Sequence, residues 1–313
     1  MVGPHWVAPL RQTPHRRIRK ISNNVSKLAR FILHPTDFST ESSVALAHAV
    51  HIAVNNKATL ELLHVETDPA ANEDDQDDVP DEDWNQFPSI RTMLETWGLI
   101  PSGDARSDVT DLGIEISEVV SYGADVPEVI AEYCQRRPID MVVLSTSGRD
   151  GFASLLMPST AERVANKMSN LLIPTLFVPK HSRGCVDVET GRVTMNHVLV
   201  PVDHELDAEE AVERGLRAMA AFGDEQADLS LLHVGAESEF PHVEIPDSSR
   251  NVRRISQQGD PATEILSVAR DTKVNLIIMV TDGEQGLLDI LRGTTTEKVL
   301  RHAPCPVLAI PAR

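Results

Sequence analysis

The sequence predicts an α/β protein made of two tandem doubly wound domains. Short apolar runs rich in β-branched residues alternate with amphipathic stretches, as in parallel sheets that are covered on both faces. Segments of the first half of the chain recur in the same order in the second half, which indicates a tandem duplication. A length of 313 residues fits two domains. We therefore expect each domain to hold a five-stranded parallel sheet with helices on both faces, in a Rossmann-like arrangement.

In the first domain the expected strands and helices alternate along the chain. Apolar runs predict strands at Phe31–His34, Leu60–Val65, Ile114–Val120, Met141–Leu144 and Thr175–Val178. Amphipathic runs predict helices at Glu41–Val54, Ser89–Trp97, Pro127–Gln135 and Ser159–Met168. An acidic run, residues 68–83, interrupts this pattern after the second strand, and we expect it to be a solvated surface loop.

Four pairs of matching blocks define the duplication. The pairs are Phe31–Ser39 with His197–Glu205, Leu60–Val65 with Leu229–Val234, Thr146–Val164 with Thr281–Val299, and Ile173–Pro179 with Cys305–Pro311. The stretch Gly235–Val252 contains two prolines and no helical period, so the second domain is expected to lack the helix that follows the second strand. The chain then divides into a basic arm (1–28), a first domain (29–180), a linker (181–194) and a second domain (195–313).

Composition excludes several classes of protein. The 29 Lys and Arg residues against 47 Asp and Glu give a net charge of −18, which argues against a broad basic face for nucleic acid or an anionic membrane. No apolar run approaches the roughly 20 residues that span a bilayer, and the N-terminus lacks the apolar core of a secretory signal. The three cysteines form no CxxC pair, so neither a zinc site nor a disulfide framework is expected. We expect a cytoplasmic protein without metal ligands.

The candidate binding residues follow the strands, because ligands of an open parallel sheet bind outside the carboxyl ends of its strands. Asp37 and Asp203 follow the first strand of each copy. A carboxylate there either accepts a hydrogen bond from a ribose hydroxyl or caps the following helix, and both interpretations stay open. After the fourth strand of the second copy, a loop with Gly283 and Gly293 ends at Thr294 and a helix start, where backbone N–H groups can approach a phosphate.

Motifs of catalysis are missing from the sequence. There is no P-loop spacing, no GxGxxG after the first strand, and no HExxH, GxSxG or paired-carboxylate arrangement. No nucleophile has an adjacent base, so we predict no catalytic residues and no enzyme activity beyond weak ATP hydrolysis. His64 and His233 lie within apolar strands, where a core histidine is the favoured interpretation, and Cys305 is expected to be buried.

The strand–PxD–helix unit, the LLHV strand, the glycine loop and APCPVL, in this order, resemble the universal stress protein family. The resemblance covers about residues 29–180 and 195–313 and is closest to the tandem type, with an adenine nucleotide alpha hydrolase-like fold. One branch of that family binds adenine nucleotides through G-x2-G-x9-G-[ST]. The second copy reads Val280-x2-Gly283-x9-Gly293-Thr294, and the first reads Ser145-x2-Gly148-x9-Pro158-Ser159. Proline at the third position removes a backbone donor, so the resemblance favours the second copy.

The resemblance implies that ATP or another adenine nucleotide, either alone or with Mg²⁺, is the ligand. In the second copy the implied binding residues are Pro201, Val202, Asp203, Val234, Met279, Val280, Gly283, Gly293, Thr294 and Thr295. Their weaker first-copy counterparts are Asp37, Val65, Gly148, Ser159 and Thr160. Asp203 would face the adenosine and Val234 the base, while the glycine loop and the two threonines would face the phosphates.

The resemblance also implies a non-catalytic stress-response protein that acts through its conformation or through contacts with a protein partner. The alternative is an interaction scaffold in which both nucleotide sites are degenerate. The family pairs its last strands at their edges, so we expect Thr175–Val178 to pair with Val307–Ile310 in an intrachain pseudo-dimer. Whether whole chains form a homodimer, and what the basic arm contacts, stay open.

The acidic run generates the first test. Deleting residues 68–83 should change the thermal midpoint by only a few degrees, since the run has few large apolar side chains to bury and its like charges repel. Thermal unfolding followed by circular dichroism measures the change. A large loss of stability would show that the run is a structural element rather than a loop.

Overall fold

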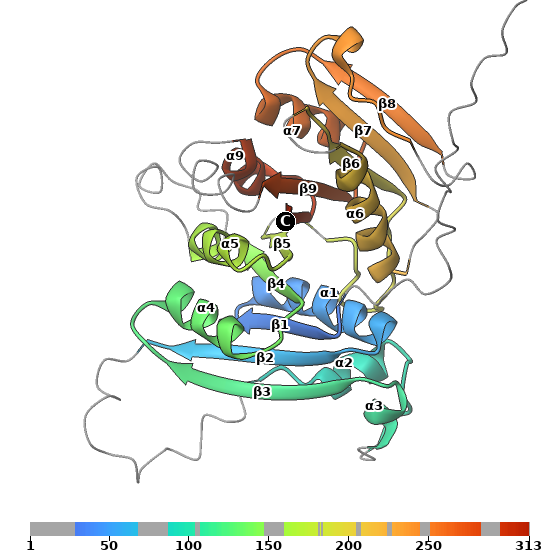
Figure 1. The fold of residues 1–313 in the computed structure, drawn as a ribbon. Coiled ribbons are helices and arrows are strands. Elements are labelled where there is room, and N and C mark those ends of the chain that lie inside the picture. The colour runs from blue at the N-terminus through green and yellow to red at the C-terminus, as the bar shows by residue number, and fades with distance from the viewer. Residues whose placement is uncertain are drawn as a thin grey trace, which may run out of the picture.

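The structure, a computed structural model, describes residues 29–67, 87–103, 107–146, 160–180, 182, 184–204, 208–223, 227–244, 251–282 and 295–312. The described strands form one continuous ten-stranded sheet with helices on both faces (Figure 1). The predictions for the basic arm and for the acidic run concern residues that lie outside this described part.

The elements of the first half (29–180) match the predicted ones. Its strands are β1 (Phe31–Thr36), β2 (Thr59–Glu66), β3 (Glu115–Tyr122), β4 (Met141–Thr146) and β5 (Thr175–Pro179). Its helices are α1 (Thr40–Asn56), α2 (Ile90–Thr96), α3 (Ser107–Asp111), α4 (Val126–Arg136) and α5 (Thr160–Asn170). Only the short helix α3 was not predicted.

The second half (195–312) repeats most of this series. Its strands are β6 (His197–Pro201), β7 (Asp228–Val234), β8 (Val252–Gln257), β9 (Leu276–Asp282) and β10 (Val307–Ala312). Its helices are α6 (Ala208–Ala221), α7 (Pro261–Asp271) and α9 (Thr295–His302). Between β7 and β8, the described residues hold only a 3₁₀ turn at Glu237–Glu239, as the two prolines of this stretch predicted.

The strand order is β3-β2-β1-β4-β5-β10-β9-β6-β7-β8. Read outward from the centre, both halves have the same order, and all pairs within a half are parallel. The predicted doubly wound α/β fold is therefore confirmed. Because β5 and β10 pair antiparallel, the strands of the two halves run in opposite directions. The carboxyl ends of one half thus lie on the same edge of the sheet as the amino ends of the other.

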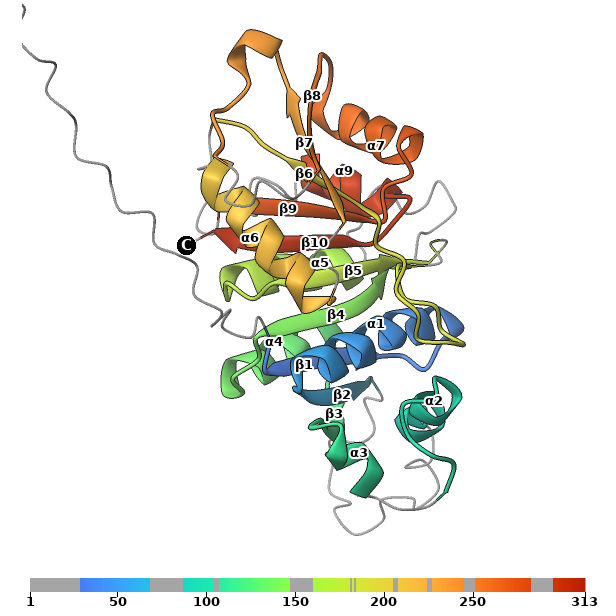
Figure 2. The same cartoon turned by 90° about the vertical axis from the view of Figure 1, so that its right-hand side faces the viewer.

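Each face of the sheet has its own core. On one face, α1, α2 and α6 pack on strand residues such as Leu60 and Leu231, and Figure 2 shows α1 and α6 on that common side. On the other, α4, α5, α7 and α9 pack on the alternate strand residues, such as Leu33 and Leu199. Strands buried on both faces need apolar residues at successive positions, which explains the continuous apolar runs in the sequence.

The two halves meet where β5 pairs with β10, so the predicted pairing of the last strands is confirmed. Val307 lies opposite Phe177 and Leu308 opposite Leu176 in the antiparallel register. All four side chains are almost completely buried. The pairing closes two apolar edges at once, since an unpaired strand here would expose backbone donors and acceptors together with these side chains.

An ion pair crosses the junction between α5 and α9. The Arg301 guanidinium donates to Glu162 Oε1 from Nη2 at 2.8 Å and from Nε at 3.2 Å, and Nη2 also meets Glu297 at 2.7 Å. The Glu162 side chain is buried, and Arg301 has a raised pKa because of its hydrogen bond to Glu162. A buried carboxylate needs such a partner, so this pair fixes the angle between the two helices.

Side chains of α1 cap the end of α6 in the other half. Asn55 Nδ2 donates to Ala221 O at 2.9 Å, and Asn56 Nδ2 donates to the same carbonyl at 2.9 Å. His51 Nε2 lies 3.1 Å from Phe222 O. The last carbonyls of a helix have no partner within it, so these contacts satisfy α6 and hold the halves together on the face opposite the ion pair.

The predicted linker is a folded element rather than an open connection. Val186 and Val193 form an antiparallel bridge, and Cys185 and Val186 are buried. His48 of α1 anchors the segment: its Nδ1 donates to Val44 O at 2.7 Å, and its Nε2 accepts from the backbone N–H of Cys185 at 2.9 Å and of Val186 at 3.3 Å. The imidazole is therefore neutral in the folded state, and burial lowers its pKa to about 4.

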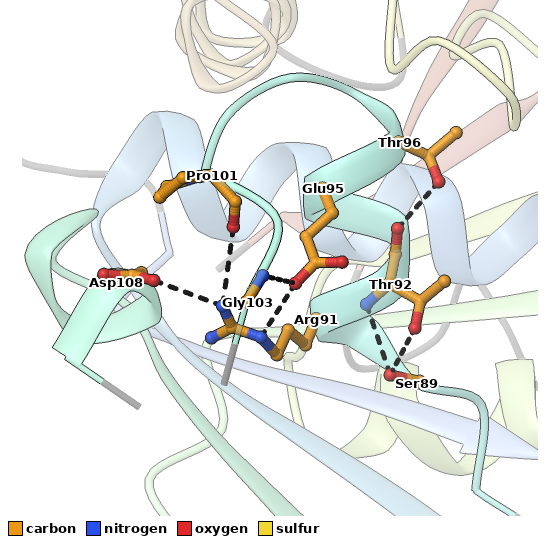
Figure 3. Close-up of polar contacts among 8 residues, drawn as sticks. All are labelled: Ser89, Arg91, Thr92, Glu95, Thr96, Pro101, Gly103 and Asp108. Carbon is orange, nitrogen blue, oxygen red and sulfur yellow. Dashed lines mark hydrogen bonds and ion pairs between the residues drawn. The ribbon is translucent and has the colours of Figure 1, made fainter. Parts of the chain in front are cut away.

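The segment between β2 and β3 has its own polar core around Arg91 (Figure 3). The Arg91 guanidinium meets Glu95 at 2.9 Å and Asp108 at 3.1 Å, which joins α2 to α3. Trp97 at the end of α2 donates from Nε1 to Val188 O at 2.8 Å, so this segment also supports the linker. Among the described residues, no helix is long and apolar enough to cross a membrane.

The neutral form of His48 gives a pH-dependent stability. Its folded pKa lies below the ordinary value of 6.5, so the unfolded chain binds more protons between about pH 6.5 and 4. The stability that His48 contributes is present above pH 6.5 and is lost as the pH falls toward 4. Urea unfolding at several pH values should show a smaller slope in His48→Gln than in the wild type, by up to about 1.4 kcal/mol per pH unit. Equal slopes would show that His48 is not buried in its neutral form.

Candidate functional site

The sequence-predicted binding residues of the second half gather at one edge of the sheet. β6 lies between β9 and β7. The chain runs from β6 to β7 and β8 on one side and then crosses over to β9 on the other side, so the strand order reverses at β6. Pro201 ends β6, Val234 ends β7, Met279 and Val280 lie in β9, and Thr295 begins α9. This is the switch point of a doubly wound sheet, where such folds bind ligands. The residues Gly283, Gly293 and Thr294, like Gly148 and Ser159 of the first half, lie outside the described part of the chain.

The backbone after β6 is fixed to the end of β7. Val202 N donates to Leu232 O at 2.8 Å, and Val202 O accepts from Nδ1 of His233 at 3.2 Å. Val202 is buried, whereas Asp203 beside it is exposed. The carboxylate of Asp203 thus stands at the open edge on a rigid support.

The two β9 residues of the site point to opposite faces of the sheet. Met279 packs with the core under α7 and α9, and Val280 packs with the core under α6. Val280 occupies the position of the first glycine in the family signature. Its branched side chain lies on the face away from α9 and therefore leaves the α9 side of the strand clear.

His233 holds an unused acceptor at this edge. The tautomer that donates from Nδ1 to Val202 O leaves Nε2 as an acceptor, and Nε2 is buried without a hydrogen-bond partner among the described residues. Gly235 allows the chain to pass close to the ring, since a Cβ at this position would lie 2.4 Å from Nε2. The prediction of a core histidine is confirmed for His233, and its position beside Val234 adds a polar group that the sequence did not assign to the site.

Both halves place rings around the histidine of their second strand. In the first half, Phe38 stacks on His64 at 4.3 Å, and Phe87 meets Phe38 edge-on at 5.1 Å. In the second half, His204 and Phe240 approach His233 edge-on at 5.7 and 5.8 Å. The rings over the second-half histidine are therefore packed less closely.

In the first half, Asp37 serves the start of α1. Its Oδ1 accepts from Ser39 N at 3.1 Å and from Ser39 Oγ at 2.6 Å, and Ser39 Oγ caps α1 by accepting from Ser42 N at 3.2 Å. The N-cap is therefore Ser39 rather than Asp37, which supports the cap from outside. Val65 is the last but one residue of β2 and Thr160 begins α5, at positions equivalent to Val234 and Thr295.

His34 is a buried polar residue that the sequence analysis did not single out. Its Nδ1 donates to Val143 O at 2.8 Å, its Nε2 lies 3.3 Å from Ser42 Oγ, and burial lowers its pKa to about 4. The same signal, a histidine in an apolar strand, led us to expect His64 in the core; His64 is only half-buried, because its strand position lies near the open edge, and its Nδ1 donates to Thr36 O at 2.9 Å. Burial also raises the pKa of all three cysteine thiols to about 12, so Cys305 is buried as predicted and is a poor nucleophile. The described residues contain no group of three or more acidic, histidine or cysteine side chains suited to a metal.

Comparison with known proteins now adds to this geometry. Residues 29–174 and 247–311 match the universal stress protein family. The chain belongs to this family. Universal stress protein YxiE of Bacillus subtilis is 27% identical over 148 residues, which cover 37% of this chain and 98% of YxiE. Universal stress protein MJ0531 of Methanocaldococcus jannaschii is 45% identical over 53 residues, but the match covers only 17% of this chain and 31% of that protein.

The solved structures support the fold of the whole chain. A universal stress protein from Archaeoglobus fulgidus superimposes with a TM-score of 0.58 at 18% identity, over 92% of this chain and 98% of its own. A universal stress protein from Pseudomonas aeruginosa gives 0.58 at 16% identity, over 91% and 94%. Both therefore share the two-part architecture as a fold, and the resemblance to the universal stress protein family seen in the sequence is confirmed.

The close approach of Gly235 to His233 can be tested by a double-mutant cycle. Gly235→Ala should destabilise the protein by about 1–3 kcal/mol, because the new methyl group overlaps the ring that Val202 holds in place. In a His233→Ala background the same change should cost much less, since the atoms nearest to the added carbon all belong to His233. Urea unfolding of the four proteins measures both costs. Equal costs in the two backgrounds would contradict this geometry.

Proposed function

We propose that this universal stress protein binds an adenine nucleotide at the carboxyl edge of its second half and acts without catalysis. The observation that carries the proposal is the switch point between β6 and β9. There the ends of three neighbouring strands and the start of α9 bring together Asp203, Val234, Val280 and Thr295.

The chemistry of these residues fits an adenosine. Asp203 is an exposed carboxylate that can accept from ribose hydroxyls, and Val234 offers an apolar surface for the base. The buried Nε2 of His233 is an acceptor of the kind that an adenine amino group or a ribose hydroxyl can satisfy. The start of α9, which follows the glycine loop, supplies backbone N–H groups and partial positive charge for the phosphates. A bound Mg²⁺ would neutralise phosphate charge.

Two features favour the second half over the first. The second glycine loop keeps Gly283 and Gly293, whereas the first has Pro158 in place of the latter. The rings around His233 are packed less closely than those around His64.

The action that we propose is conformational. The two halves share one sheet and are joined by the linker, the α1–α6 contacts and the Arg301–Glu162 pair, so a ligand at one half can alter a surface formed by both. The junction between β5 and β10 then acts as the interface of a dimer within one chain, and a partner protein would bind the surface that both halves form. Three free, scattered cysteines suit the cytoplasm as the place of action.

Titration of Mg-ATP by isothermal calorimetry tests the proposal. The wild type should bind; Gly293→Pro should weaken binding by about ten- to hundredfold through loss of a phosphate contact, and Gly148→Pro, the matched change in the first half, should leave it unchanged. Val280→Gly should preserve or strengthen binding. If Gly148→Pro loses binding while Gly293→Pro keeps it, the site lies in the first half. No binding by any variant would favour an interaction scaffold with both sites degenerate.

A further inference from the structure

A pocket lies at the edge of the second half where its strands begin, opposite the proposed nucleotide site. It has a volume of about 560 Å³, within the usual range for small-molecule sites. Residues at the amino ends of β6, β7 and β8 line it together with the end of α7. Ser230 of β7 pairs with Arg253 of β8, and His197 lies two residues before Leu199, the β6 residue that pairs with Ser230. All three therefore face the side of the sheet that α7 covers. The pocket is therefore separate from the proposed nucleotide site.

The first half fills the equivalent space with its own side chains. Glu61 takes the place of Ser230, since Glu61 pairs with Leu33 and Ser230 pairs with the matching Leu199. Glu61 is buried, accepts from Tyr133 Oη at 2.8 Å, and meets Arg137 Nη1 at 3.2 Å. The first half thus closes this position with a carboxylate, a guanidinium and a phenol.

The second half has smaller residues at these positions. Asp140 accepts from the backbone N–H of Arg30 and Phe31 just as Asn275 accepts from those of Asn196 and His197, which aligns the two helix ends. Counting back from these residues, Arg137 corresponds to Thr272 and Tyr133 to Val268. Large side chains have been replaced by Ser230, Val268 and Thr272 on the same backbone, and a pocket remains.

The floor of the pocket presents acceptors. Nδ1 of His197 lies 3.1 Å from Thr272 O, and in the tautomer that donates to this carbonyl, Nε2 accepts from the Ser230 hydroxyl at 2.7 Å. The remaining lone pairs of the buried Ser230 oxygen can then accept from a ligand. The adjacent end of α7 carries the partial negative charge of a helix C-terminus, which favours a cation.

The rim carries both signs of charge. Arg253 and Lys273 are exposed cations, and Asp228 and Asp271 are exposed carboxylates. Within the described part of the chain, none of the four forms an ion pair. Two cations and two carboxylates thus surround hydrogen-bond acceptors at the bottom of the pocket. This arrangement is complementary to a molecule without net charge that carries one ammonium and one carboxylate group.

We propose that this pocket binds a small zwitterion of the free amino-acid class. Its ammonium group donates to Ser230 Oγ and to the carboxylates, and its carboxylate meets Arg253 and Lys273. The ligand thereby replaces the charged groups that Glu61 and Arg137 supply in the first half. The second half of the protein is then a sensor of two small molecules, one at each edge of the sheet.

The test is binding of each of the twenty free L-amino acids, by thermal shift and then by calorimetry. At least one should bind the wild type, and Asp228→Asn and Lys273→Gln, which change exposed side chains, should each weaken it about tenfold or more. The combined change His197→Phe, Ser230→Glu, Val268→Tyr and Thr272→Arg copies the first half and should abolish binding.

The Mg-ATP titration on the same variants shows whether each protein keeps its fold and whether the two sites are independent. If the filled variant does not fold, the two rim variants decide. Three results would overturn the proposal. They are amino-acid binding that survives in the rim variants, binding of inorganic phosphate in place of any amino acid, and no binding of any amino acid at about 10 mM.

Discussion

The antiparallel pairing of β5 with β10 is the contact on which the rest of the structure depends. Leu176 and Phe177 on one strand and Val307 and Leu308 on the other are buried on both faces of the sheet. Either half alone would expose an apolar strand edge with unpaired backbone groups, which is a template for association with other chains. Joined, they give a single ten-stranded sheet, and the direction of this pairing sets the two binding edges of the molecule. The carboxyl ends of the second half stand beside the amino ends of the first.

The two halves share a common backbone frame, but their side chains differ at matched positions. Arg301 of α9 binds the buried Glu162 of the other half, whereas the corresponding residue of α5, Asn166, has a buried oxygen with no partner among the described residues. The side chains of α1 cap the end of α6, whereas His48 of α1 binds the linker rather than an element of the second half. The two-fold relation is thus approximate, and each half can serve a different role while the backbone stays the same.

Three histidines, His34, His48 and His233, are buried in the core, and each is held in one tautomer. His34, His48 and His233 all donate from Nδ1 to a backbone carbonyl, which leaves Nε2 as an acceptor. In His48 this acceptor receives two backbone N–H groups, and in His34 it lies against a serine hydroxyl. In His233 it has no partner within the described part of the chain, at the place where the site is expected. A satisfied buried group stabilises the fold, while an unsatisfied one marks a position where a ligand adds something.

The sequence by itself determined the fold class, the duplication and nearly every strand and helix, because these depend on local apolar patterns and on repeated motifs such as LELLHV and LSLLHV. It also placed the end strands at the junction. Helix α3 was missed because five residues carry too little periodicity. The burial of Cys185 and Val186 in the linker could not be predicted, because it depends on His48, far away in the chain. Only the tertiary structure decided which way Val280 points, that His233 keeps a free acceptor, and that Ser230 opens a pocket where Glu61 fills one. Each of these features depends on contacts between strands and helices that are distant in sequence. The effect of one residue there is set by the side chains that surround it in the folded protein.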